Sequence, residues 1–173
     1  PLMSADEVAG YKPRMSKPEA AAYLGDSFFK DVDFYHGNQQ WVAQSVQTDG
    51  AQPELNVNGI YGQGFYMGSS RDIGEQYAAA AAHVDTVELM TGRAKVKNPF
   101  VATEAEITAL AKSFPGGQSN GSNSEAVTNF LRAKGYDSVY VKDLGYVSAF
   151  DGRQVVIYDS EVAEQGSETL GRY

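Results

Sequence analysis

The sequence predicts a single domain of the α+β class, in which helices and strands follow one another without regular alternation. A chain of 173 residues with 42% apolar and 12% aromatic residues can bury one core. Short strand-like runs lie between helix-like runs in irregular order, which disfavours a doubly wound parallel sheet. The phosphate-binding turn of such a sheet is also missing, because Gly62-Gln63-Gly64 lacks the third glycine and precedes a strand-like run.

Helix starts are marked by capping boxes, in which a Ser or Thr and a Glu three residues later satisfy each other's backbone N–H groups. Three such boxes begin at Ser16, Thr103 and Ser122. A serine at 69 or 70, followed by five alanines at 78–82, marks another helix. We therefore predict helices over residues 16–24, 38–48, 70–82, 103–113 and 122–134.

Strands are predicted where residues alternate between apolar and polar or are rich in β-branched and aromatic types. The segment 32–36 alternates in this way, and Gly37-Asn38 is expected to end it. The predicted strands are residues 32–36, 65–67, 86–97, 137–142 and 154–159. Segments rich in Gly, Asn and Ser are predicted loops, at 49–64, 115–124 and 143–153.

Composition excludes several classes of function. Without cysteine the chain has no disulfide and no thiol catalysis, and two histidines alone disfavour a zinc site. A net charge of −8 without a basic cluster disfavours nucleic acid and anionic membranes as partners. No apolar run approaches the length of about 18 residues that a membrane helix needs, and no signal peptide is visible. The acidic charge does not exclude a soluble anionic cofactor, because backbone N–H groups can bind it.

One histidine and two tyrosines are candidates for ligand binding. His36 closes a strand ahead of Gly37, so it either packs at the strand end or donates a hydrogen bond to a ligand hydroxyl that approaches the glycine backbone. Tyr66 lies on a strand and Tyr77 eleven residues further on, in a predicted helix. The two rings either belong to the core or form a slot for a flat aromatic ligand.

Several short segments, taken in order, resemble the diphtheria-toxin and poly(ADP-ribose) polymerase branch of the ADP-ribosyltransferases, with its His-Tyr-Glu or His-Tyr-Gln signature. The resemblance implies a fold of split, mixed or antiparallel β-sheets with flanking helices around an NAD cleft. It implies a catalytic domain at 31–162, an N-terminal extension with one helix at 1–30, and a polar tail at 163–173. The segments are Tyr35-His36-Gly37, the motif Gly-Gln-Gly-Phe-Tyr-Met at 62–67, Tyr77, Lys97-Asn98-Pro99, and the strand-like runs at 135–139 and 155–159.

The resemblance also implies roles for individual residues, with NAD as co-substrate and no metal. His36 would bind a ribose hydroxyl of NAD, and the backbone of Gly37 would hold the nicotinamide carboxamide. Tyr77 would stack on the nicotinamide ring while Tyr66 packs from the other side. Ser69 is a candidate to replace the serine with which polymerase-type relatives touch the carboxamide.

The family's catalytic glutamate corresponds to Gln154, which can accept a hydrogen bond but carries no charge. Weak or slow transfer is expected, because charge-assisted hydrogen bonds are roughly twice as strong as neutral ones, unless Asp151 supplies the charge. Tyr146, Phe150 and Asp151 lie in the predicted loop that contacts the acceptor in the family. The two aromatic residues either dock a target protein or fold back on the core.

We therefore expect a monomeric mono-ADP-ribosyltransferase that modifies a protein, such as a bacterial effector, toxin or phage-borne enzyme. It would work in the cytoplasm or after translocation into a host cell. The alternative is a catalytically weakened NAD-binding module, which the glutamine at 154 motivates. A transferase acting on nucleic acid is disfavoured by the acidic charge.

Overall fold

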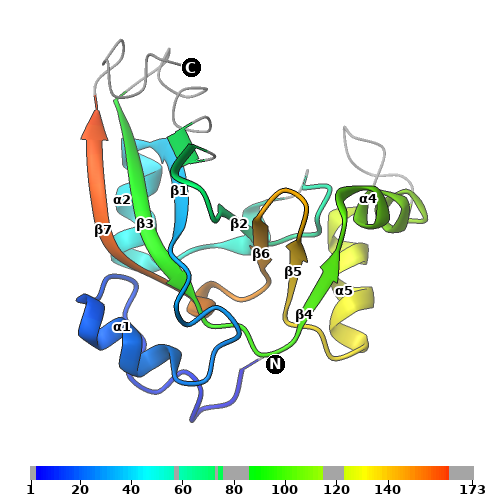
Figure 1. The fold of residues 1–173 in the computed structure, drawn as a ribbon, viewed down its shortest axis with the longest axis horizontal. Coiled ribbons are helices and arrows are strands. Elements are labelled where there is room, and N and C mark those ends of the chain that lie inside the picture. The colour runs from blue at the N-terminus through cyan, green and yellow to red at the C-terminus, as the bar shows by residue number, and fades with distance from the viewer. Residues whose placement is uncertain (1–2, 57–58, 73, 76–85, 115–122, 164–173) are drawn as a thin grey trace.

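The computed structural model describes residues 3–56, 59–72, 74–75, 86–114 and 123–163 (Figure 1). These residues form an α+β fold with one seven-stranded, mostly antiparallel sheet and four α-helices, which confirms the predicted class. The strands are β1 (Phe34–Gln39), β2 (Phe65–Gly68), β3 (Val87–Ala94), β4 (Pro99–Ala102), β5 (Ser138–Val141), β6 (Tyr146–Ala149) and β7 (Val155–Ala163). The helices are α1 (Lys17–Leu24), α2 (Gln40–Asp49), α4 (Glu104–Lys112) and α5 (Ser124–Ala133).

The sheet has the strand order β4-β5-β6-β2-β1-β3-β7, and only β4 and β5 are parallel. Its weakest link lies in the middle, where β1 and β2 share a single register pair, Tyr35 with Gly68. On either side the pairing is extensive: β1 and β3 share six register pairs, and β2 and β6 share four. Figure 1 shows β1, β3 and β7 as one group and β2, β6, β5 and β4 as the other.

Two main clusters of buried residues stabilise the sheet, and the first of them spans both groups of strands. In the first cluster, Phe34, Met90 and Ile157 are fully buried. They pack together with residues of β2 and β6 and with the buried residues of α2. The helices α4 and α5 cover the second group, where Ile107 and Leu131 are completely buried. Burying an aliphatic side chain of this size contributes roughly 1.5–3 kcal/mol. The N-terminal extension is not separate, because Met15 and Tyr23 pack with Val156 of β7.

Two of the predicted capping boxes are confirmed. The hydroxyl of Ser16 accepts from the backbone N–H of Glu19 at 3.3 Å, and the Glu19 carboxylate accepts from the N–H of Ser16 at 3.0 Å. The same reciprocal pair joins Thr103 and Glu106 at 3.2 and 2.9 Å. The boxes use only residues three positions apart, so local sequence determines them.

The third helix start differs from the prediction by one residue. The N-cap of α5 is Asn123, whose side-chain oxygen accepts from the N–H of Ala126 at 3.1 Å. Ser122 lies outside the described residues, as does most of the helix predicted at 70–82. Of that range the structure describes Ser70, Arg71, Asp72, Gly74 and Glu75, and all of these but Ser70 are helical.

The strand predictions need three corrections. The strand β1 does not end at Gly37, because Gly37 pairs with Leu89 and the pairing with β3 continues to Gln39. The strand β4 was not predicted; Pro99 is tolerated there because it is the first residue of a strand at the sheet edge. The predicted loop at 143–153 contains a central strand, β6, which pairs with both β2 and β5.

Candidate functional site

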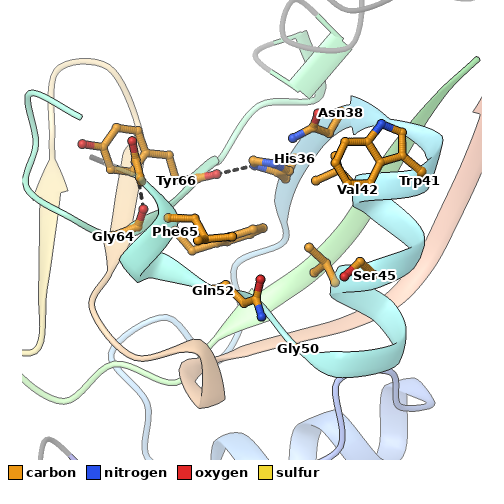
Figure 2. A pocket seen from close by; sticks show the side chains of 13 residues that line it. His36, Asn38, Trp41, Val42, Ser45, Gly50, Gln52, Gly64, Phe65 and Tyr66 are labelled. Atoms are coloured by element: carbon orange, nitrogen blue, oxygen red, sulfur yellow. Dashed lines mark hydrogen bonds between the residues drawn. The ribbon is translucent and has the colours of Figure 1, made fainter. Parts of the chain in front are cut away.

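An apolar cavity of about 440 Å³ lies where α2 faces β1 and β2, and the segment 50–56 closes it (Figure 2). It contains two of the residues predicted to bind a ligand. Among the described residues that line it there is no Lys, Arg, Asp or Glu. The side chains that line it include Trp41, Val42, Phe65, His36, Asn38 and Gln52.

The helix α2 presents one face to the cavity. Trp41, Val42, Ser45 and Val46 follow the i, i+1, i+4, i+5 spacing of a single helix face, and all four line the cavity. Val46 is buried, whereas Trp41 at the other end of the face is 66% exposed. The indole N–H of Trp41 donates to the side-chain oxygen of Gln39 at 3.1 Å, which fixes the edge of the ring.

His36 has a defined protonation state. Its Nδ1 lies 2.6 Å from the backbone oxygen of Tyr66. Since a carbonyl only accepts, Nδ1 must carry the proton. Burial lowers the pKa of His36, and the hydrogen bond to Tyr66 opposes this without reversing it. The imidazole is therefore neutral near pH 7, and Nε2 is an acceptor rather than the donor expected from the sequence.

The ring of His36 is held at the junction of β1 and β2. It packs against Phe65 with a centroid distance of 4.4 Å and an interplanar angle of 32°. Figure 2 shows the bond to Tyr66 on one side of the imidazole, and Asn38 and Trp41 on the other. This arrangement orients Nε2 as a fixed acceptor at the cavity wall.

Tyr66 borders the cavity, but its hydroxyl is bound within the protein. The hydroxyl donates to the backbone oxygen of Gly62 at 2.6 Å and accepts from the N–H of Tyr61 at 2.9 Å. A Cβ atom on Gly59 would lie 2.0 Å from the same hydroxyl, so the loop needs glycine there. Tyr66 therefore organises the loop ahead of β2 and positions His36 through its carbonyl.

The other predicted ligand-binding residues are only partly brought together. Gly37 follows His36 in β1 and is buried against β3. Ser69 lies just beyond β2, where its N–H donates to the carbonyl oxygen of Gly145 at 2.8 Å, and it does not line the cavity. Tyr77 lies outside the described residues.

Gln154 does not line the cavity; it lies in the short 3₁₀ helix Gly152–Gln154 before β7. It is 1% exposed. Its Oε1 accepts from the N–H of Asp151 at 2.8 Å, and its Nε2 donates to the carbonyl oxygen of Lys95 at 3.2 Å. Both ends of the amide are thus used in joining the last turn to the end of β3.

Asp151, the predicted substitute for the missing charge, is also engaged. Burial raises the pKa of its carboxyl group, but the hydrogen bonds from Arg153 outweigh burial and hold that pKa below its usual range. The guanidinium of Arg153 lies 2.7 Å from the Asp151 carboxylate. The carboxylate is therefore ionised and paired at neutral pH, outside the cavity lining.

The two aromatic residues predicted as docking contacts pack inward. Phe150 is 2% exposed, and its carbonyl oxygen accepts from Arg132 at 2.8 Å. Tyr146 is half-buried and packs on the ring of Tyr61, with centroids 5.9 Å apart. Of the two alternatives for these residues, the structure supports folding back on the core.

Sequence reasoning missed the contribution of α2 to the site. Trp41, Val42 and Ser45 directly follow the Tyr-His-Gly motif at helical spacing, and this was the available signal. Gln52 and Asn56 gave no such signal, because the loop that carries them reaches the cavity only through the fold.

The search of protein-family models found no match to this chain, and no curated protein matched it. None of the described helices is long and apolar enough to cross a membrane. In the described part of the chain, no three His, Asp or Glu side chains come together in a way that could hold a metal ion.

Proposed function

We propose that this protein is an NAD-dependent mono-ADP-ribosyltransferase, and that the cavity beside His36 holds part of NAD. The carrying observation is the weak pairing in the middle of the sheet. The strands with the two motifs, β1 and β2, are neighbours that share one register pair, and His36 bridges them through the carbonyl of Tyr66. The family resemblance implies split sheets around an NAD cleft, and the weak pairing of β1 with β2 supports such a split.

The chemistry of His36 fits a ribose. A neutral imidazole with a fixed Nε2 acceptor can take a hydrogen bond from a sugar hydroxyl without an added charge. Transfer would break the bond between the nicotinamide nitrogen and ribose C1, passing through an oxocarbenium-like transition state related to glycoside cleavage. Nicotinamide leaves with the bonding electron pair, and a nucleophile on the protein acceptor bonds to C1 and loses its proton.

A second candidate function is an NAD-binding module without turnover. It is favoured by Gln154, whose amide makes a structural hydrogen bond at each end. It is also favoured by the absence of a carboxylate among the described residues of the cavity. A cationic ribose would then lack the preorganised charge whose loss commonly costs about 10²–10³ in rate.

One experiment separates the two functions. The protein is incubated with NAD labelled in the adenylate part, with and without a cell lysate, while NAD affinity is measured by calorimetry. Label on a discrete protein, lost in His36→Ala and retained in the surface control Val101→Ala, supports transfer. Saturable binding with neither label transfer nor nicotinamide release supports the module. Absence of NAD binding would overturn both.

A further inference from the structure

The cavity has an exposed aromatic surface that the proposed roles of His36 and Tyr66 do not use. Trp41 is 66% exposed and Leu55 is 70% exposed, and both line the cavity. They come from different elements, Trp41 from α2 and Leu55 from the short 3₁₀ helix Pro53–Leu55. Large apolar side chains left open to solvent at a concave site are typical of ligand-binding positions.

We propose that this cavity binds an adenine ring, which stacks on the indole of Trp41. That the adenine belongs to NAD rests on the proposed function, whereas the stacking site itself rests on the geometry. The bond from the indole N–H to Gln39 fixes the ring by its edge and leaves its face for a planar ligand. Stacking of a base on an aromatic side chain is favourable for any purine.

Two amides of the lining complement the hydrogen-bonding edge of adenine. Oδ1 of Asn38 accepts from the N–H of Gln39 at 2.8 Å, which leaves its NH₂ group as a donor. Nδ2 of Asn56 donates to the carbonyl oxygen of Gly64 at 2.9 Å, which leaves its Oδ1 as an acceptor. Adenine offers ring-nitrogen acceptors and an amino donor along one edge, the pattern that carboxamides recognise.

The lack of charged side chains among the described lining residues restricts the charge that a ligand can carry into the cavity. No lysine or arginine is among its described residues, and its histidine, His36, is neutral. A phosphate inside such a cavity would lose its hydration without gaining a cation. The site therefore takes a neutral nucleoside unit whose 5′-phosphate lies outside the cavity, and it selects against the additional 2′-phosphate of NADP, so NAD is favoured over NADP.

Trp41 is the only tryptophan of the chain, so its fluorescence reports on this site directly. The native protein is titrated with adenosine, AMP, ADP-ribose, NAD, NADP and nicotinamide. We expect saturable quenching by the adenosine-containing ligands other than NADP, and no saturable quenching by nicotinamide alone. NADP binding as tightly as NAD would overturn the charge argument.

Variants are compared by calorimetry, because the reporter is lost with Trp41. Trp41→Ala should weaken AMP and NAD binding by about 5- to 150-fold, the usual cost of removing one stacking partner. Trp41→Phe should restore most of the affinity. Because Trp41 is exposed, we expect both Trp41 variants to fold. Circular dichroism tests their folding, with Val101→Ala as a control at another exposed position.

The outcomes distinguish this inference from the proposed function. Equal NAD affinity in Trp41→Ala and the native protein would overturn the stacking site and leave NAD binding in place. AMP binding that depends on Trp41, without NAD binding, would support the stacking site and overturn the proposed function. No binding of any adenosine ligand would overturn both.

Discussion

Replacing Gln154 by glutamate tests whether this position is structural or catalytic. The substitution keeps the shape of the side chain and exchanges its NH₂ group for an oxygen. The carbonyl oxygen of Lys95, now 3.2 Å from the amide donor, would then face a second acceptor. The site is 1% exposed, so solvent cannot compensate.

The expected loss of stability can be bounded from both sides. Leaving one buried acceptor unsatisfied costs about 1–3 kcal/mol. The variant can avoid burying a charge by folding with the new carboxyl protonated, which again donates to Lys95. At pH 7, protonating a group with an unfolded pKa of about 4.3 costs about 3.7 kcal/mol, at 1.36 kcal/mol per unit. Gln154→Glu should therefore lose about 1–4 kcal/mol.

The stability of Gln154→Glu should also depend on pH. Burial raises the pKa of the new carboxyl in the folded state, so above about pH 4.3 the folded state binds more protons than the unfolded state. The stability of the variant relative to the native protein then falls as pH rises, and the difference closes toward pH 4.

Urea denaturation between pH 5 and 8 measures this difference, and nicotinamide release from NAD measures activity. The control is Gln44→Glu, the same exchange at an exposed position of α2, which should change stability by less than about 0.5 kcal/mol. We expect Gln154→Glu to be less stable and no more active. Native stability at pH 7 together with faster nicotinamide release would refute the structural role of Gln154.

Four further substitutions test the site and the fold. Burial lowers the pKa of His36 in the folded protein. As pH falls below about 6.5, the unfolded state therefore binds the proton first and the protein loses stability. His36→Gln should remove this part of the fall in unfolding free energy, measured by denaturation curves from pH 7.5 to 5. A Cβ atom on Gly64 would lie 2.0 Å from Ser148 Oγ and 3.0 Å from the carbonyl oxygen of Ala149. Gly64→Ala should therefore lower the free energy of unfolding by about 1–3 kcal/mol, as measured by thermal melting. Adding Ser148→Ala should recover part of this stability. Ser148→Ala alone should be neutral or stabilising in the same assay, because within the described structure its buried hydroxyl has no hydrogen-bond partner; a clear loss of stability would contradict this. Thr103→Ala removes an N-cap and should cost about 1 kcal/mol by calorimetry, within a range of 0.5–2.

The parts of the fold that the sequence predicts well are those determined within one turn of the chain. The capping boxes at Ser16 and Thr103 need only a partner three residues away, and both helices begin where predicted. The strands β4 and β6 depend on partners far along the chain: Val101 pairs with Tyr140, and Ser148 pairs with Tyr66. Four residues carry too little pattern of their own to reveal such pairing.

In the candidate site, too, the sequence predicts the residues of local motifs and misses those that the fold brings in from elsewhere. His36 and the carbonyl of Tyr66 come from two local motifs, and the structure joins them at 2.6 Å. The cavity beside them is completed by Trp41 and by the segment 50–56, which meets α2 only after the chain has folded. Their contribution arises from tertiary packing and leaves no periodic signal in the loop.

The strand order restricts how a transfer reaction could work in this protein. Between β2 and β7 lie β1 and β3, so β7 is three strand spacings from β2, or about 14 Å at 4.8 Å per spacing. Gln154 at the start of β7 is therefore no sheet neighbour of Tyr66, and it is not among the described residues that line the cavity. The neighbour of β2 on its other side is β6, where Ser148 stands opposite Tyr66. The two strands that neighbour β2 are β6 (Tyr146–Ala149) and β1 (Phe34–Gln39), and neither includes a carboxylate. The described lining of the cavity thus supports the proposed binding of NAD more directly than the proposed transfer, because transfer would need a charged group from outside that lining.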